Sequence, residues 1–366
     1  FTTKTAVYTL IRGFPGWEIL IFIGCLMTIY GIFYALLEND MRRILAYSII
    51  NQVGFMVTGV GIGTTMALNG AAAHAFAHII YKGLLFMSAG SVLFMTGKSK
   101  CTDLGGLYKT MPWTLIFGSV GALAISAFPL TSGFTTKSLI IESSVHQHLI
   151  WAWLILEIAS AGVFLHAGIK FPYFVFFAKD KGLRPGETNW SMLIAMGFLA
   201  FMCFFIGLYP QPLYNILPYQ MADYYAYTGA HLTGQLQLLM FSALVFFLFL
   251  PLLKRTETIS LDTDWFYRIG GRLVYTIVDK GLNGVNAMFE FVFISLVRGL
   301  ARFFQDSMAR MALFILVNYW LIIGISGKRL EIKKSSVYSD IMQGSLPIGI
   351  GAGLSAVFII LIFLFN

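Results

Sequence analysis

Long apolar stretches separated by short polar loops dominate the pattern of this chain. A transmembrane helix needs about 20 consecutive, mostly apolar residues. By this criterion the pattern predicts a partial helix at 1–13 and full spans at 17–38, 44–63, 67–96, 112–145, 149–178, 190–208, 232–253 and 343–365. We therefore expect an all-α fold, a polytopic bundle of transmembrane helices.

The run 112–145 is too long for one plain helix and is interrupted by FPLTSGF at 128–134. Proline removes a backbone donor, and non-helical backbone at membrane depth occurs where transporters bind ions. The pattern predicts a broken helix, with a simple proline kink as the alternative. Lys137, just past the interruption, favours the broken helix.

The region 256–342 has a different pattern, in which charged and apolar residues alternate at helical spacing. Leu273 and Ile277 recur opposite Arg268 and Arg272. Such a pattern is typical of an amphipathic helix that lies along a membrane surface. The more apolar stretch 311–325 either lies in the interface or crosses the membrane, which would invert the last helix. We favour the interfacial interpretation.

Composition agrees with a protein whose solvent is lipid. The 366 residues are 58% hydrophobic and 11% charged, with a mean hydropathy of +0.77, whereas soluble domains carry about 25% charged residues. The net charge of +8 does not indicate nucleic-acid binding, because the basic residues lie mainly in alternate loops and near the C-terminus. Loops rich in Lys and Arg face the cytoplasm, so we expect a multi-pass protein of the cytoplasmic (inner) membrane. These loops contain Arg42 and Arg43; Lys98, Lys100 and Lys109; Lys179, Lys181 and Arg184; and Lys254 and Arg255.

The sequence offers no ligands for a metal or cofactor. Cys25, Cys101 and Cys203 are widely spaced and form no metal-binding or disulfide pattern. We expect no redox centre, nucleotide site or hydrolytic triad in this chain. Because it opens on Phe1 within an apolar stretch, we also expect it to be a fragment whose N-terminal half is missing.

Several ionisable residues fall inside the predicted spans. A charge at the bilayer centre costs about 2.5–3.5 kcal/mol on insertion scales, so each such residue is a functional hypothesis. His74, His78 and Lys82 recur every four residues and therefore share one helix face. Lys4 lies in the first helix and Lys137 follows the break. We predict that these five side chains form a proton relay.

Glu142, Glu157, His166 and Lys170 are secondary candidates for the same relay. Glu142 and Lys170 could instead reach a membrane boundary with their polar ends. Likewise, His74 could be a structural histidine, and Lys4 could be an end residue. For His78, Lys82 and Lys137 the structural interpretation is weaker, because lysines in mid-membrane need a partner or a hydrated cavity.

Histidine and lysine suit proton transfer at membrane depth. Histidine titrates near neutral pH, and a low-dielectric site disfavours the charged form of lysine. Both types of side chain can therefore take up and release protons there, with water between them.

Three sequence blocks resemble a known family, the antiporter-like membrane subunits of complex I, membrane-bound hydrogenases and Mrp-type Na+/H+ antiporters. NDMRRILAYS at 39–48, followed by NQVGFM at 51–56, is similar to the family's D-x-K/R-R-x-x-A-Y-S signature. HAFAHIIYKGLLFMSAG at 74–90 and ISAFPLTSGFTTK at 125–137 look closest to the branch formed by the D subunits of Mrp antiporters. The resemblance covers about 1–210.

The resemblance implies the C-terminal half of a fold built from two inverted repeats. Lys4 then matches the lysine of the family's eighth helix, and His74, His78 and Lys82 match the basic stripe of its eleventh. Lys137 matches the lysine at the break of the twelfth helix. Four regions follow: the antiporter-like core at 1–210, an added span at 211–255, an amphipathic lateral helix at 256–342 and a final anchor at 343–366.

Three functions compete at this stage. The first is a proton-translocating subunit of a multisubunit Mrp-type cation/proton antiporter, with other membrane subunits as partners. The second is a membrane-arm subunit of complex I or of a membrane-bound hydrogenase. The third is a structural scaffold that conducts nothing, against which the retention of Lys4, His78, Lys82 and Lys137 argues. Whether sodium moves together with protons stays open.

Overall fold

The computed structural model describes residues 2–220, 224–252, 264–344, 352–353 and 355–360. Two units make up the chain, Phe1–Ser260 and Leu261–Asn366. The described residues are mostly helical, and the isolated bridge between Asp40 and Lys100 is the extent of strand pairing among them.

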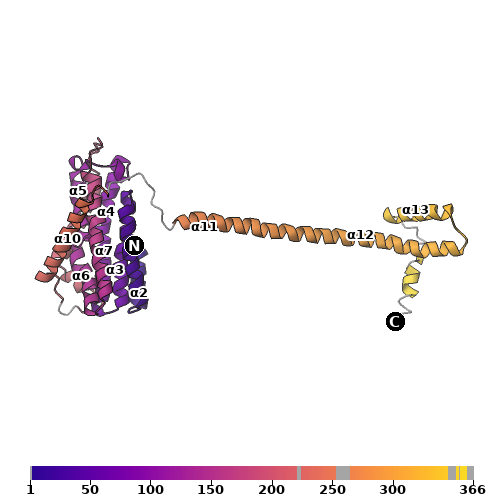
Figure 1. The fold of residues 1–366 in the computed structure, drawn as a ribbon, viewed down its shortest axis with the longest axis horizontal. Helices are drawn as coiled ribbons and strands as arrows, with labels where there is room; N and C mark the ends of the chain where they lie inside the picture. The colour runs from indigo at the N-terminus through magenta and orange to yellow at the C-terminus, as the bar shows by residue number, and fades with distance from the viewer. Residues whose placement is uncertain (1, 221–223, 253–263, 345–351, 354, 361–366) are drawn as a thin grey trace. The chain divides into compact units, whose positions relative to one another are not determined.

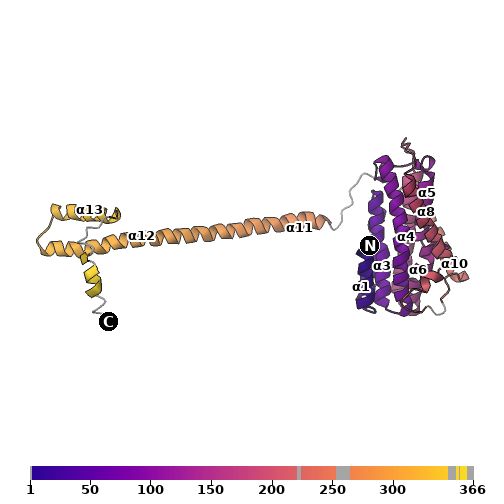
Figure 2. The ribbon, with the colours of Figure 1, turned by 180° about the vertical axis from the view of Figure 1, so that it is seen from behind.

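The first unit is a bundle of long helices that run side by side (Figures 1 and 2). Helix α4 lies at its centre and packs against α1, α3, α5, α6 and α8. The helices of this unit are α1 (Thr2–Gly13), α2 (Ile19–Leu37), α3 (Met41–Ile62), α4 (Thr65–Thr96), α5 (Pro112–Ile125), α6 (Ser132–His146), α7 (Ile150–Val163), α8 (Trp190–Leu208), α9 (Gln211–Tyr214) and α10 (Gly229–Leu248). Two short 3₁₀ helices, Cys101–Asp103 and Leu107–Lys109, lie in the loop between α4 and α5.

Helices α2 and α3 approach each other closely because small residues face one another. A Cβ added at Gly54 would lie 2.6 Å from the carbonyl oxygen of Gly24. Close backbone approach through small residues is a common basis of helix packing in membranes. Among the contacts between helices of this unit, the α2–α3 pair is the most extensive.

The structure confirms the broken helix. Helix α5 ends at Ile125 and α6 begins at Ser132. Between them, Ala127 and Leu130 adopt positive φ angles of 55° and 71°. The chain therefore leaves the helical conformation within the bundle and resumes it just before Lys137.

The helix predicted at 149–178 is not a plain α-helix. Helix α7 continues into two π-helical segments, Phe164–Lys170 and Tyr173–Phe177. Pro172, which has no backbone N–H to donate, separates them. The sequence pattern did not predict these π-helical segments, because a wider helical turn leaves the apolar character of the run unchanged.

Seven helices among the described residues are long and apolar enough to cross a membrane. Six of them, α2, α3, α4, α7 with its extension, α8 and α10, coincide with predicted spans. The seventh is Asp264–Phe303, in the region where the sequence predicts an interfacial helix. Lys254, Arg255 and Asp262 lie outside the described residues, as does most of the predicted final span at 343–365.

The second unit begins with a continuous helical rod (Figure 1). It comprises α11 (Asp264–Thr276), a π-helical turn (Ile277–Leu282) and α12 (Asn283–Ile322). After α12 the chain turns at Gly324 and Gly327, both at positive φ, and α13 (Lys328–Met342) packs against α12. The apolar stretch 311–325 thus largely continues α12, and the region 256–342 is not a single helix.

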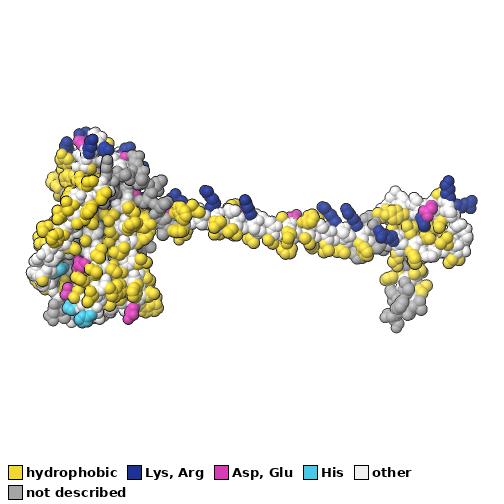
Figure 3. Space-filling view, viewed as in Figure 1, with side chains coloured by type: hydrophobic (Ala, Val, Ile, Leu, Met, Phe, Trp, Pro, Cys, Tyr) yellow, Lys and Arg dark blue, Asp and Glu magenta, His cyan; other side chains and the backbone are white. Residues whose placement is uncertain are grey.

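Lys and Arg side chains project from one edge of this rod, and apolar side chains cover the opposite edge (Figure 3). In α11, Arg268 pairs with Asp264 at 2.9 Å. The rod is therefore amphipathic along much of its length, as the sequence pattern predicts.

Candidate functional site

The basic stripe of α4 points into the bundle. His74, His78 and Lys82 are 0%, 3% and 4% exposed. Neighbouring positions of α4 hold small residues, among them Ala71, Ala73 and Ala77, which are also buried. Because these side chains are short, adjacent helices pack close enough to enclose the stripe.

His74 is fixed between two other helices. Its Nε2 lies 2.9 Å from Oε1 of Gln52 on α3, and its Nδ1 lies 3.1 Å from Oγ1 of Thr136 on α6. The Tyr81 hydroxyl also donates to Oε1 of Gln52, at 3.1 Å. Since that oxygen only accepts, Nε2 of His74 carries a hydrogen.

The Thr136 hydroxyl connects His74 to the start of α6. Its oxygen lies 2.8 Å from the carbonyl oxygen of Ser132, to which it can donate. A hydroxyl has one hydrogen, so Thr136 donates either to Ser132 or to Nδ1 of a neutral His74. When Thr136 donates to Ser132, its oxygen can accept a hydrogen bond from a protonated Nδ1 of His74, one residue before Lys137.

His78 and Lys82 contrast with His74. Within the part of the chain that the structure describes, Nε2 of His78 and Nζ of Lys82 have no hydrogen-bond partner. The Lys82 amine lies 6.0 Å from the centre of the Phe86 ring. Buried polar atoms without partners are rare and commonly mark ordered water.

Lys137 is 1% exposed and lies in the second turn of α6. Its Nζ donates to Oγ of Ser160 on α7 at 2.8 Å and lies 5.3 Å from the centre of the Phe55 ring. The break before α6 requires a glycine at 133, because an added Cβ there would lie 1.9 Å from the carbonyl oxygen of Ala124. Packing at the break thus sets the position of Lys137.

A cavity of about 70 Å³ adjoins Lys137. Glu142, Glu157, His231 and Gln235 also line it. Glu157 is half-buried and interacts electrostatically with Lys137. Acidic and histidine side chains also reach the surface of the bundle near α6 and α10 (Figure 3).

Lys4 is less enclosed than the other four members of the predicted relay. It is half-buried on α1, and its Nζ lies 3.8 Å from Sδ of Met56 on α3. The structure thus places His74, His78, Lys82 and Lys137 inside the bundle and Lys4 at its edge.

The secondary candidates differ from one another in their surroundings. Glu142 is exposed and lies 3.5 Å from His146. His166 is completely buried; no side chain among the described residues bonds its ring nitrogens, and the backbone of Gly162, one turn earlier, interacts with the ring. Lys170 is also completely buried, but its amine donates to the carbonyl oxygens of Ala35, Leu36 and Glu38 at 2.6, 2.9 and 2.8 Å.

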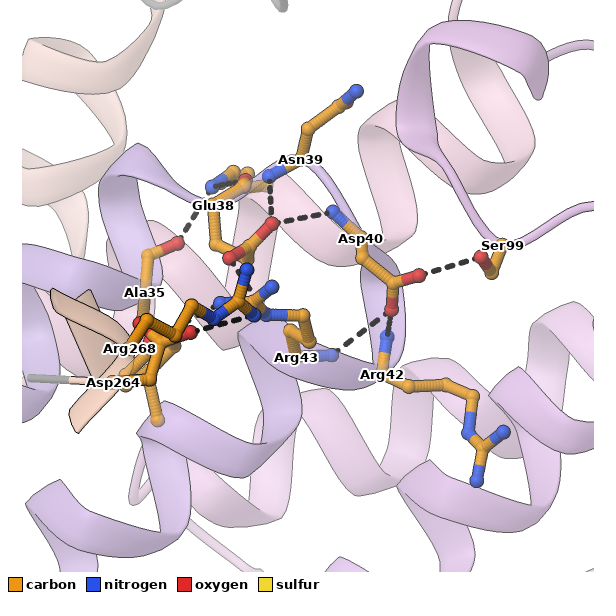
Figure 4. Close-up of polar contacts among 11 residues, drawn as sticks. Ala35, Glu38, Asn39, Asp40, Arg42, Arg43, Ser99, Asp264 and Arg268 are labelled. Carbon is orange, nitrogen blue, oxygen red and sulfur yellow. Dashed lines mark hydrogen bonds and ion pairs between the residues drawn. The ribbon is translucent and has the colours of Figure 1, made fainter. Parts of the chain in front are cut away.

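Lys170 therefore caps the C-terminal end of α2, where helix carbonyls lack partners within the helix. The carboxylate of Glu38 accepts hydrogen bonds from the backbone of Asn39 and Asp40 (Figure 4). Asp40 in turn caps α3 through the backbone N–H groups of Arg42 and Arg43. The side chains of Glu38, Asp40 and Lys170 thus hydrogen-bond the backbone where α2 connects to α3.

The sequence interpretation did not pair the relay candidates with their polar partners. Gln52, Thr136 and Ser160 belong to other helices than the side chains they contact, so no local spacing identifies them. His231 lies on α10, beyond the segment with recognisable motifs. A histidine next to an apolar run is a weak signal, because its nearness to Lys137 depends on the fold.

Residues 2–163 match the NADH:quinone oxidoreductase/Mrp antiporter transmembrane family. This segment belongs to that family. The resemblance predicted from the motifs is confirmed, and the antiporter family segment contains Lys4, the basic stripe of α4, Lys137 and the start of the α7 region.

Relatives of the antiporter family segment come from several kinds of complex. The D subunit of the Na(+)/H(+) antiporter of Alkalihalophilus pseudofirmus is 31% identical over 235 residues, which are 60% of this chain and 47% of that protein. The NADH-ubiquinone oxidoreductase chain 5 of Dictyostelium discoideum is 31% identical over 52% of this chain and 29% of its own length. Hydrogenase-4 component B of Escherichia coli is 30% identical over 52% of this chain and 32% of its own length. The chain thus spans less than half the length of these relatives, and identity does not separate the branches.

Solved structures show the same fold. The Mrp complex of Dietzia sp. matches with a TM-score of 0.53 and 19% identity, over 57% of this chain and 49% of the other. The membrane-bound sulfane sulfur reductase, an archaeal respiratory membrane complex, matches with a TM-score of 0.54 and 24% identity, over 84% and 56%. The all-α, membrane-spanning fold class is therefore confirmed.

Proposed function

We propose that this chain is part of a proton-translocating membrane subunit of a multisubunit cation/proton antiporter of the Mrp type. The observation that carries the proposal is the set of ionisable groups buried within the antiporter family segment. Burying such groups is costly, and two of them, His78 and Lys82, have nitrogens that no described residue satisfies. A site of this kind fits groups that exchange protons with water better than groups with a structural task.

In this proposal protons pass along the bundle through Lys4, His74, His78, Lys82 and Lys137. Each amine or imidazole binds and releases one proton, and water bridges the gaps between them. Thr136 couples His74 to the start of α6, since its hydroxyl has a single hydrogen to share. From Lys137 the cavity lined by Glu157, Glu142 and His231 leads outward.

The test replaces Lys137 by alanine in the complete complex, reconstituted in vesicles. A positioned proton carrier contributes about a hundredfold or more to a proton-transfer step, so we expect Lys137→Ala to reduce proton transport by at least that factor. Lys4→Ala is expected to have a comparable effect. Lys179→Ala removes a loop lysine and is the matched control. Full transport by both relay variants, with normal assembly, would refute the proposal.

A second candidate is a membrane-arm subunit of a redox-driven complex. The structural match to the sulfane sulfur reductase complex covers 84% of the chain. This share is larger than the share of the residues that belongs to the first unit, Phe1–Ser260. In either case the partners are other membrane subunits. Co-purifying iron–sulfur or flavin subunits would favour the second candidate, and sodium uptake by vesicles that contain the complex would favour the first.

For the second unit we propose a lateral, membrane-surface role. The polar edge of the rod in Figure 3 supports this assignment, because a helix that crosses lipid would not need a charged edge along its length. Such an element would brace neighbouring subunits of the complex.

A further inference from the structure

The part of the chain that follows α8 folds over the start of α6, the helix that contains Lys137. The Tyr214 hydroxyl donates to the carbonyl oxygen of Thr135 at 2.6 Å. The Tyr224 hydroxyl donates to Oγ of Ser138, also at 2.6 Å. These two bonds flank Lys137 along α6, and both donors lie beyond the antiporter family segment. Residues outside that segment therefore help to enclose the surroundings of Lys137.

His231, in the first turn of α10, is held in one orientation within this cover. Its ring stacks on the buried ring of Phe134 in α6, with the ring centres 4.5 Å apart and the planes at 13°. Its Nδ1 lies 2.7 Å from the carbonyl oxygen of Ala226. Since a carbonyl oxygen only accepts, Nδ1 carries a hydrogen, and Nε2 is the acceptor of the neutral ring. The bond to Ala226 thus leaves Nε2 for water.

One cavity joins this ring to Lys137. Both side chains line the cavity of about 70 Å³ described above. It has room for more than one water molecule, at about 30 Å³ each. Lys137 is 1% exposed, whereas His231 is half-buried and has part of its surface outside the bundle. The imidazole therefore connects the cavity beside a buried amine with the surface.

We propose that His231 is the outermost proton carrier of the relay and moves protons between Lys137 and water outside the bundle. The inference rests on the proposed function and adds to it a carrier from α10. An N–H bond of the Lys137 ammonium breaks, water in the cavity passes the proton on, and an N–H bond forms at Nε2 of His231. The imidazolium then releases that proton to outside water. Nδ1 keeps its hydrogen throughout.

The surroundings of His231 favour a transient positive charge on its ring. A cation over an aromatic face is attracted to it, and Phe134 presents such a face. The hydrogen bond to the Ala226 carbonyl strengthens when its donor is charged. The carboxyl groups of Glu142 and Glu157 line the same cavity. His231 can therefore accept a proton from the cavity, and its contact with outside water lets the proton leave.

The first test measures proton transport by the reconstituted complex with His231→Phe. Phenylalanine can stack on Phe134 but cannot bind a proton. We expect transport to fall by about tenfold, below the usual range for a proton carrier, because the carboxyl groups in the cavity remain. His148→Asn is the control, since His148 is exposed, does not line the cavity, and asparagine tolerates its positive φ. Full transport by an assembled His231→Phe complex would overturn the proposal.

Chemical rescue separates a proton carrier from a side chain that only covers the cavity. His231→Ala leaves space for a small molecule where the ring was, so imidazole added to the medium can carry protons there. We expect imidazole to raise transport by His231→Ala several-fold and to leave His231→Phe unchanged, because its ring fills the space. An equal response of the two variants would overturn the proposal.

A third measurement needs no variant. Diethyl pyrocarbonate modifies neutral imidazole nitrogens that reach water, and mass spectrometry of the peptides locates the modified histidines. We expect modification of His231 in the intact complex and none of His74, which is 0% exposed and has both ring nitrogens bonded. An unmodified His231 would have no contact with water and would overturn the proposal, even if the variants fail to assemble.

The two proposals fail separately. Full transport by Lys137→Ala and Lys4→Ala would remove the relay function. Loss of transport in those variants, combined with full transport by His231→Phe, would leave the relay in place and eliminate His231 from it.

Discussion

Buried lysines in this bundle have two different kinds of environment. The Lys82 amine has no partner among the described residues, whereas the Lys170 amine contacts three carbonyl oxygens at the end of α2. Equal burial therefore does not imply an equal role. From its contacts we expect Lys170 to stabilise the connection between α2 and α3.

Replacing Lys170 by methionine tests this assignment. Methionine fills a similar volume but cannot donate, and each buried polar group left unsatisfied costs about 1–3 kcal/mol. We expect Lys170→Met to lower the melting temperature of the purified complex, with Lys179→Met, in an exposed loop, as the control. A variant of normal stability that has lost proton transport would return Lys170 to the relay.

The sequence predicted which basic residues lie inside the bundle better than which side chains they contact. Residues four apart on a helix share a face, so His74, His78 and Lys82 were predictable as one stripe, and the structure confirms that the stripe is buried. Gln52, Thr136 and Ser160 come from other helices and become neighbours of these side chains through packing. Spacing along the chain holds no information on such pairs.

At the scale of helices, the break between α5 and α6 depends on one glycine. Because a Cβ at Gly133 would overlap the carbonyl oxygen of Ala124, we expect Gly133→Ala to destabilise the protein by about 1–3 kcal/mol, the usual cost of overpacking. Gly90→Ala in α4, where an added Cβ meets nothing within 4 Å, is the matched control. The measurement is thermal unfolding of the two purified variants. Equal stability of both variants would show that the break does not need glycine.

The loop before α8 is joined to the loop before α5 through Asp180. Two hydrogen bonds from Arg184, and one from the backbone N–H of Gly182, hold the pKa of the Asp180 carboxyl well below its usual range. Lys109 adds a weaker contact at 3.5 Å. A carboxyl with a depressed pKa contributes stability above its unfolded pKa of about 3.9, and that stability is lost as the pH falls through the folded pKa.

Comparison of the protein with its Asp180→Asn variant tests whether the stability contributed by Asp180 is lost as the pH falls. We expect the variant to melt at a lower temperature, by an amount that is constant above about pH 5 and shrinks below about pH 4. Differential scanning fluorimetry of the complex between pH 7 and pH 3 measures it. A difference that stays constant down to pH 3 would contradict a depressed pKa.

Hydropathy identified most helices of the first unit, and FPLTSGF identified the break, because both signals are local. The π-helical segments after α7 could not be predicted in this way. One additional residue per turn leaves an apolar run apolar, and the widening depends on what packs around Phe164–Lys170.

At the scale of the whole molecule, the helix Asp264–Phe303 of the second unit either crosses the membrane or lies on its surface. Asp264–Phe303 is apolar and long enough to cross a membrane, yet basic residues line one edge of it (Figure 3). The amphipathic pattern was predictable from the sequence. The reversal of the chain into α13 was not predicted from the sequence, although it occurs at two glycines, Gly324 and Gly327, that both have positive φ angles.

Single cysteines along this rod distinguish the two placements. For a surface helix we expect cysteines at Arg268, Arg272 and Glu290 to react with a membrane-impermeant maleimide, and those at Val285 and Val292 to be protected by lipid. The measurement is labelling of intact membranes, for which the buried Cys25, Cys101 and Cys203 serve as the background. Protection at Glu290 with labelling confined to the ends would show a spanning helix.

The wide turn at Phe164–Lys170 also affects how related chains are compared. Each π-turn contains one residue more than the α-turn it replaces. A homologue of equal length with an ordinary helix here would have everything after it rotated by roughly 100° about the helix axis, whereas one shorter by a residue would keep the register. The homologue of equal length would need another way to cap α2, since its counterpart of Lys170 would face elsewhere. An ordinary helix at this point without the loss of a residue would therefore mark a branch of the family with a different internal connection.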